Sequence, residues 1–252
     1  RDRSPSRGLG DVYKRQLSTC IADYNVAANA QMIKIPETSK PIDACLGEPM
    51  MCVANIVRAV EPKMGDRVAV IGCGFMGLMV IAGLKSRALG DIVAIDLDEK
   101  RLEMAVQYGA TKTINPKNVD VEDVSFELTH GRMYDCIVEI TGSLRGLQTA
   151  LSVAKISGRG KILAPSVYSK NETWTEEMAY NMMYRSPIIH VVHPYYTNEY
   201  MHTLEIGVEA YVKGVFPTEE LITHRIPFER VDEGFRLLDT NPPGYIKGII
   251  TF

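Results

Sequence analysis

Three features of the sequence predict an α/β fold built on a doubly wound parallel sheet. Short β-branched apolar runs alternate with segments rich in helix-forming residues from residue 67 onward. A glycine-rich turn follows the first apolar run, and a carboxylate ends the second. Strands that alternate with helices of ten or more residues need crossover connections, which place the strands parallel in one sheet.

The expected elements follow one another closely along the chain. Residues 68–71 form a β-branched strand, and the helix after the glycines is expected to reach about residue 89. Residues 91–96 form a second strand, and residues 99–108 form a helix that Gly109 stops at the left-handed cap position. The sequence further predicts a strand at 134–141, a helix at 144–156 and strands at 160–164 and 186–192.

Composition is that of an ordinary globular protein and excludes several classes. The chain of 252 residues is 46% hydrophobic and 23% charged, with a net charge of −3. Nucleic acid is not an expected partner, because phosphate neutralisation needs a surplus of Lys and Arg. The five cysteines include no CxxC pair, which favours reduced thiols in a cytoplasmic protein. Residues 68–84 carry no charge, but a buried strand, turn and helix explain this run without a membrane.

Residues 1–16 differ from the remainder of the chain. They carry five basic and two acidic residues, a net charge of +3, which leaves −6 for the rest. No Met begins the chain, and no apolar stretch resembles a signal peptide. The segment is similar to translated sequencing-adapter sequence, and a basic targeting arm is the alternative. We therefore expect a non-native segment and a natural protein that is cut near Leu17.

A glycine motif follows the first predicted strand and opens a helix. Its sequence is Gly-Cys-Gly-Phe-Met-Gly, the pattern G-x-G-x-x-G. Gly72 permits a tight turn, Gly74 lets a pyrophosphate approach the backbone, and Gly77 lets the helix pack closely on its strand. The amides of Phe75 and Met76 then face the phosphates from a helix N-terminus. The motif predicts a dinucleotide site of the Rossmann type.

An acidic residue supports this prediction. Asp96 ends the second strand, 19 residues beyond Gly77, where a carboxylate accepts hydrogen bonds from ribose hydroxyls. The same carboxylate repels a 2′-phosphate, so NAD is favoured over NADP. Arg101 could reach the ribose or phosphate edge, or be a solvated charge at a helix start. Two alternatives stay open: a turn without a ligand, and a methyltransferase, whose third glycine typically falls where this chain has Met76.

Short phrases on both sides of this segment point to a family. They are Ala22-Asp23-Tyr24-Asn25-Val26, Ile33-Lys34-Ile35-Pro36, Gly47-Glu48-Pro49, Lys63-Met64-Gly65-Asp66-Arg67-Val68, Glu139-Ile140-Thr141-Gly142-Ser143, Leu221-Ile222-Thr223-His224 with Ile226-Pro227-Phe228, Glu233-Gly234-Phe235, and the ending Ile246-Lys247-Gly248-Ile249-Ile250-Thr251-Phe252. With these phrases the chain resembles the zinc-dependent alcohol and polyol dehydrogenases, of the sorbitol and threonine type, in the medium-chain dehydrogenase/reductase family.

The resemblance implies a division into domains. Residues 17–48 would be the remnant of a GroES-like β-rich catalytic domain, and residues 49–193 the Rossmann NAD-binding domain. Residues 194–252 would return to the catalytic domain. It also implies hydride transfer between NAD and a secondary alcohol or polyol whose oxygen binds zinc. Residues 186–192 match the strand through which family dimers extend their sheet, so a homodimer or homotetramer is expected.

The resemblance also implies roles for single residues. Glu48 stands before proline, where the polyol branch completes its zinc site; a helix-start carboxylate is the alternative. The principal zinc ligands of the family, a Cys and a His-Glu pair, lie upstream of Leu17, so the catalytic residues are expected outside this fragment, which would be inactive. Lys247 matches a basic residue that can contact the pyrophosphate, with a surface lysine as the alternative. Thr141 would border the adenosine and its ribose.

Three functions remain open from the sequence. The first is a fragment of an NAD-dependent zinc alcohol or polyol dehydrogenase. The second is a zinc-free quinone or enone reductase of the same superfamily, against which Glu48-Pro49 counts. The third is a module that binds NAD without turnover. The predicted substrate wall, at 165–168 and 195–196, is too short to rank the polyols.

Overall fold

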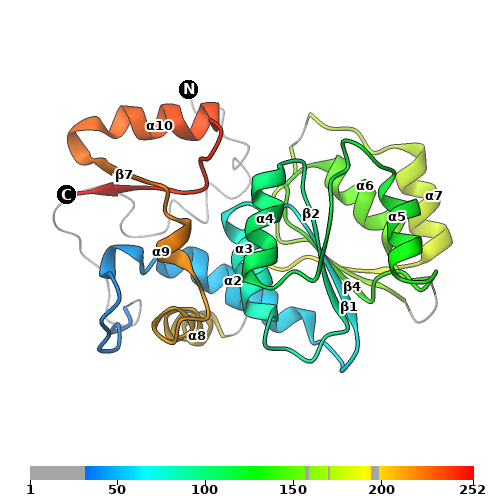
Figure 1. Cartoon of the computed structure of the whole chain (residues 1–252), viewed down its shortest axis with the longest axis horizontal. Helices are drawn as coiled ribbons and strands as arrows, with labels where there is room; N and C mark the ends of the chain where they lie inside the picture. The colour runs from blue at the N-terminus through cyan, green and yellow to red at the C-terminus, as the bar shows by residue number, and fades with distance from the viewer. Residues whose placement is uncertain (1–31, 157–158, 170, 194–198) are drawn as a thin grey trace.

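The centre of the protein is a six-stranded parallel sheet with helices on both faces (Figure 1). The computed structural model describes residues 32–156, 159–169, 171–193 and 199–252. The strands lie in the order β3-β2-β1-β4-β5-β6. Their bounds are β1 (Arg67–Ile71), β2 (Asp91–Ile95), β3 (Lys112–Ile114), β4 (Cys136–Glu139), β5 (Lys161–Leu163) and β6 (Ile188–His190). The order reverses between β1 and β4, as in doubly wound dinucleotide-binding folds.

Successive side chains of each strand enter two different apolar cores. Val68 and Val70 of β1 belong to the core beneath helices α2 (Gly47–Val60), α3 (Phe75–Leu84) and α4 (Glu99–Tyr108). Ala69 and Ile71 belong to the opposite core, beneath α5 (Val121–Leu128), α6 (Leu144–Val153) and α7 (Glu176–Arg185). Because both faces are covered, the strands are apolar throughout rather than alternating.

The C-terminal part begins with two helices that share the first core. Helix α8 (Tyr200–Val212) packs on α2, and a Cβ at Gly207 would lie 2.7 Å from the carbonyl carbon of Met50, so the two backbones meet closely. Helix α9 (Thr218–Leu221) adds Leu221 to the same core. A separate pair of parallel strands and a helix follow, at the left of Figure 1. These are β7 (His224–Pro227), β8 (Gly248–Thr251) and α10 (Val231–Thr240), with short 3-10 turns at Ile42–Ala44 and Phe228–Arg230.

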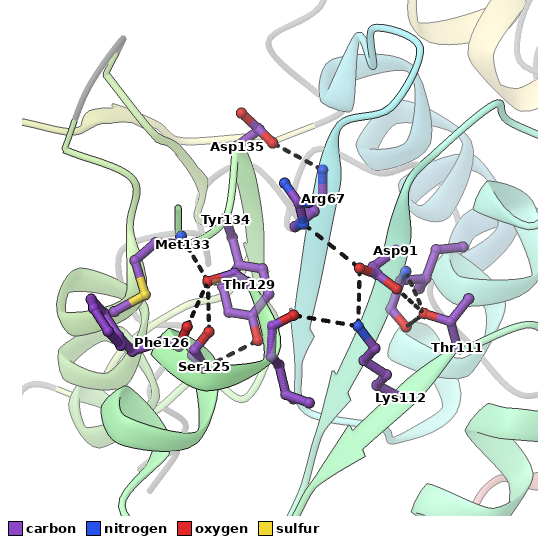
Figure 2. A network of polar contacts seen from close by, with 12 residues as sticks. Arg67, Asp91, Thr111, Lys112, Ser125, Phe126, Thr129, Met133, Tyr134 and Asp135 are labelled. Carbon is purple, nitrogen blue, oxygen red and sulfur yellow. Dashed lines mark hydrogen bonds and ion pairs between the residues drawn. The ribbon is translucent and has the colours of Figure 1, made fainter. Parts of the chain in front are cut away.

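Polar residues connect the strands at the amino edge of the large sheet (Figure 2). The backbone N–H of Arg67 donates to Asp135 at 2.9 Å, and the Arg67 Nε lies 3.7 Å from Asp91 Oδ2. Asp91 also accepts from Lys112 at 3.2 Å, which joins the starts of β1, β2 and β3. Nearby, the hydroxyl of Tyr134 donates to Ser125 at 3.1 Å. This network stabilises the edge opposite the carboxyl ends of the strands.

The predicted fold class is confirmed, and several predicted boundaries are wrong. The helix after the glycines ends at Leu84 rather than near residue 89, because the apolar run stops there and exposed residues 85–88 follow. The strand predicted at 134–141 shortens to β4, and α6 ends at Val153 rather than residue 156. Strand β3 and helix α5 had no counterpart in the prediction.

Other predictions remain untested by the structure. The segment 1–16, the phrase at 22–26 and the substrate-wall residues 195–196 lie outside the described residues. The expected domain limits at residues 17–48, 49–193 and 194–252 stay predictions. Within the described part of the chain, none of the helices has both the length and the apolar character needed to cross a bilayer. The uncharged run at 68–84 forms β1, the glycine turn and α3 instead.

Candidate functional site

A cavity of about 610 Å³ opens at the carboxyl edge of the large sheet. Its walls include the ends of β1 and β2 and the turn after β4. It therefore lies at the point where the strand order reverses, the usual ligand position in open α/β sheets. The connection from α10 to β8 supplies the remaining wall. Lining residues from these segments include Gly72, Gly74, Asp96, Arg101, Thr141 and Pro242.

The glycine turn has the geometry that its motif requires. Gly72 has φ +98°, and a Cβ there would also lie 3.0 Å from Thr141 Cγ2. A Cβ at Gly77 would lie 1.9 Å from the carbonyl oxygen of Gly72, which no side chain can tolerate. A Cβ at Gly74 would meet nothing within 4 Å. The first and third glycines are thus required by the fold itself, whereas Gly74 leaves space on the cavity side.

Helix α3 begins directly after this turn. Gly74 is its N-cap, and Phe75 and Met76 are its first two residues. Gly74 has no side chain that could bond to the free amides of the first turn. The N-terminus therefore presents N–H groups and the positive end of its dipole beside the cavity, an arrangement that favours an anion.

Asp96 lies at the end of β2 and is partly buried. Its Oδ2 accepts from the backbone N–H of Cys73 at 2.6 Å, and its Oδ1 accepts from the N–H of Asp98 at 2.8 Å. The carboxylate thus connects β2 to the glycine turn. Two carboxylate oxygens offer about four lone-pair sites, so two bonds leave acceptor capacity for a ligand.

Arg101 lies on the first turn of α4, whose N-cap is Asp98. Its Nη2 donates to Asn241 Oδ1 at 3.5 Å and to the carbonyl oxygen of Tyr245 at 3.4 Å. These long contacts join α4 to the connection between α10 and β8 across the cavity wall. Arg101 also lines the cavity, and the ribose contact that the sequence suggested stays a prediction.

A second cavity, of about 380 Å³, is lined by the glycine turn and the first turn of α3. Glu48, Phe75 and Lys247 are among its lining residues. The Lys247 Nζ lies 5.1 Å from the ring centroid of Phe75, which is a cation–π distance. Burial lowers the pKa of Lys247, and the nearby carboxylate of Glu48 acts in the opposite direction. The structure therefore brings the predicted Glu48 and Lys247 together beside the N-terminus of α3.

Glu48 does not form a metal centre with the residues around it. It lies in the first turn of α2, is exposed, and accepts a hydrogen bond from Cys52 Sγ at 3.2 Å. Burial, the charge of Glu48 and this hydrogen bond raise the pKa of the Cys52 thiol, whereas zinc binds the thiolate. Among the described residues no group of three or more His, Cys, Asp or Glu could hold a metal. The described residues therefore supply no zinc site by themselves, and the roles that the resemblance implies for Glu48 and for ligands upstream of Leu17 stay predictions.

Glu139 is a residue whose position the sequence did not reveal. It ends β4 and is completely buried. Its Oε1 accepts from the N–H of Thr141 at 2.8 Å and from the Thr141 hydroxyl, and its Oε2 accepts from the Tyr168 hydroxyl at 2.5 Å. Burial raises the pKa of Glu139 above its usual range, and the hydrogen bonds from Thr141 and Tyr168 offset this rise only in part. An acid at the end of an otherwise apolar strand was the signal that could have identified it.

Comparison with protein families decides the relationship. The family model described as zinc-binding dehydrogenase matches residues 76–204, just over half of the chain. The chain belongs to this family. The resemblance to medium-chain dehydrogenases is thereby confirmed. The matched residues run from the glycine motif through β6 into α8, so they include Asp96, Arg101 and Thr141.

Individual relatives agree with this family assignment. An L-threonine 3-dehydrogenase of Bacillus licheniformis is 30% identical over 223 residues, which are 87% of this chain and 61% of that one. An S-(hydroxymethyl)glutathione dehydrogenase of Saccharomyces cerevisiae is 28% identical over 241 residues, 89% of this chain and 59% of that one. The chain thus spans about 60% of the length of these curated relatives.

Solved structures show the same architecture. An oxidoreductase/dehydrogenase of unknown specificity from Escherichia coli superposes with a TM-score of 0.74 at 25% identity, over 86% of this chain and 59% of that one. The L-idonate 5-dehydrogenase of Escherichia coli superposes with a TM-score of 0.76 over 90% of this chain and 62% of that one. The latter is 18% identical, so it supports the fold alone.

Proposed function

We propose that this chain is the cofactor-binding part of an NAD-dependent dehydrogenase that oxidises a secondary alcohol or polyol. The observation that carries the proposal is the cavity at the carboxyl edge, where the glycine turn and Asp96 meet. The relatives named as threonine and alcohol dehydrogenases support the substrate class.

The residues present fit NAD. Gly74 leaves room for a pyrophosphate beside the N-terminus of α3, and Lys247 lies near Phe75, the first residue of that helix. Asp96 keeps acceptor capacity for the ribose hydroxyls. Thr141 would border the adenosine side, and Arg101 would meet the ribose edge if its contacts with the connection at 241–245 open. These residues bind and orient the cofactor, which supplies the hydride chemistry when bound.

The described residues do not supply a zinc site, so we assign no step of the reaction to zinc in this chain. The catalytic residues are proposed to lie upstream of Leu17 in the natural protein, and Glu48 to complete the metal site there. The genomic sequence upstream of the codon for Leu17 tests this. A Cys and a His-Glu pair at the family positions support the zinc mechanism, and their absence overturns it.

We also propose a homodimer or homotetramer. Strand β6 is the outer strand of the large sheet, and Ile188, Ile189 and His190 are all exposed. An exposed β-branched edge is a liability in a monomer and is normally covered. Sedimentation of the purified chain tests the assembly, and a monomer at micromolar concentration overturns it. A cytoplasmic location is proposed from the free thiols of Cys45 and Cys73 and the two other described cysteines.

Calorimetric titration with NADH, and separately with NADPH, tests the proposed cofactor. We expect saturable binding of NADH at one site per chain and weaker binding of NADPH, because the Asp96 carboxylate repels a 2′-phosphate. Absence of NADH binding by the folded chain would overturn the proposal. Tighter binding of NADPH than of NADH would overturn the choice of NAD.

A further inference from the structure

A buried carboxylate beneath the cofactor cavity has no place in the function proposed so far. Glu139 is completely buried and is the only acidic residue so buried in the described part of the chain. A buried charge is costly unless hydrogen bonds or an opposite charge compensate it. Glu139 has no ion pair among those found between the described residues, and three bonds from neutral donors offset the cost of its burial only in part. Burying this carboxylate costs free energy, so its position needs a specific explanation.

The donors lie on two different segments. Thr141 belongs to the turn after β4, and both its N–H and its hydroxyl donate to Glu139. Tyr168 belongs to the long connection from β5 to α7, and its hydroxyl donates at 2.5 Å. Glu139 therefore connects a wall of the cofactor cavity to a segment that the sequence assigned to the substrate wall.

Close packing leaves this group little freedom. A Cβ at Gly146, in the first turn of α6, would lie 2.3 Å from Thr141 Oγ1 and 2.5 Å from Glu139 Oε1. On the other side, a Cβ at Gly72 would lie 3.0 Å from Thr141 Cγ2. The Thr141 hydroxyl accepts in turn from the N–H of Ser143, the N-cap of α6. Thr141 is thus held between the glycine turn and α6.

We propose that Glu139 is a positioning residue of the cofactor site: it fixes Thr141 against the glycine turn and joins this cavity wall to Tyr168. The proposal rests on the binding of NAD proposed above. Neither Glu139 nor Tyr168 lines the cavity, whereas Thr141, Ser143 and Gly146 do. Changes at Glu139 and Tyr168 therefore act on the cofactor through Thr141.

The first test is the dissociation constant of NADH for Tyr168→Phe, measured by calorimetry well below the unfolding temperature. Loss of the hydroxyl removes one donor to Glu139. A hydrogen bond to a charged group changes an equilibrium constant about tenfold or more, and because Tyr168 acts only through Thr141, NADH binding is expected to weaken less, about fivefold. Tyr108→Phe is the matched control. Tyr108 donates to Glu220 at 3.0 Å and lines neither cavity, so its loss leaves the constant within about twofold.

The second test replaces the carboxylate itself. In Glu139→Gln one oxygen still accepts from Thr141, and the amide can donate to the Tyr168 oxygen, so NADH binding stays within about threefold of the parent. Glu139→Leu removes every acceptor and is expected to weaken binding at least about tenfold. Rescue by glutamine separates positioning from loss of stability, because each constant is measured on folded protein.

Three outcomes decide the matter. Weakened NADH binding in Tyr168→Phe but not in Tyr108→Phe supports the proposal, as does rescue by glutamine over leucine. Equal constants for Tyr168→Phe and the parent chain overturn it, even if Glu139→Leu fails to fold. A parent chain that does not bind NADH overturns the proposed function first, and this is seen before any variant is made.

Discussion

The role of Asp96 gives the sharpest prediction. Asp96→Ser removes a charge that accepts hydrogen bonds from Cys73 and Asp98 and that we propose to accept from the ribose. A hydrogen bond to a charged group contributes about 1.5–3 kcal/mol, so the NADH dissociation constant should rise about 10-fold to 150-fold. Binding of NADPH should improve or stay level, because two like charges about 4 Å apart repel by about 4 kcal/mol at an effective dielectric constant of about 20.

Titration of both cofactors into the parent and variant chains measures this effect. The ratio of the NADPH constant to the NADH constant should fall at least about tenfold in Asp96→Ser. Asp120→Ser is the matched control, since Asp120 also accepts from two backbone N–H groups but lies outside the cofactor cavity. A ratio that is the same in Asp96→Ser and in the parent would show that the carboxylate does not contact the ribose.

The remaining predictions concern the glycine turn, the basic residue beside it and a buried arginine. Gly77→Ala should lower the free energy of unfolding by about 1–3 kcal/mol, because its Cβ would overlap the Gly72 oxygen, and thermal unfolding measures this. Gly74→Ala should keep the parent stability and weaken NADH binding in calorimetry, because its Cβ enters the cavity side. Lys247→Met should weaken NADH binding about tenfold. Arg185→Met should lower stability in urea by about 1–3 kcal/mol without changing NADH binding, because it loses its bonds to Ala154 and Glu122.

Each of these predictions has a contradicting result. Equal losses of stability in Gly74→Ala and Gly77→Ala would show that the turn does not have the described geometry. Lys213→Met is the control for Lys247→Met, because Lys213 is exposed, forms an ion pair with Glu209 and lines neither cavity. If both lysine variants weaken NADH binding equally, a general loss of positive charge explains the effect. Weaker binding of NADH by Arg185→Met would link α7 to the cofactor site.

The sequence predicted the centre of the fold well because local patterns determine it. β1 and β2 are short apolar runs rich in β-branched residues, and the helix at 99–108 has the predicted bounds, between its N-cap Asp98 and Gly109, whose φ is +125°. Two of the motif glycines could be interpreted from their own surroundings, because Gly72 has a φ of +98° and a Cβ at Gly77 would overlap the carbonyl oxygen of Gly72. Local signals of this kind need no knowledge of the remaining chain.

Elements that depend on distant contacts were missed or placed wrongly. β3 has three residues, and its strand conformation comes from pairing with β2 rather than from its own composition. Arg101 was interpreted from its spacing to Asp96, and that spacing could not reveal its contacts with Asn241 and Tyr245, which lie over a hundred residues later. Glu139 belonged to a phrase that indicated the family. Its hydrogen bond from Tyr168 could not be predicted, because it depends on the path of the long connection between β5 and α7.

Asp96 directly follows β2 and Glu139 ends β4, the two strands on either side of β1, so both carboxylates lie at the carboxyl edge of the sheet. Their surroundings give them different roles. Asp96 is partly exposed and uses two of about four lone-pair sites, so it can still accept from a ligand. Glu139 is buried, and its three donors come from the protein, so it can only hold the wall in place. A partly exposed acid with free acceptor sites can recognise a cofactor, whereas a buried acid that accepts only from protein donors orders the surface that the cofactor meets. This division of tasks requires two different results from the variants above. Asp96→Ser must change the preference for NADH over NADPH, whereas Tyr168→Phe must weaken NADH binding and leave that preference unchanged.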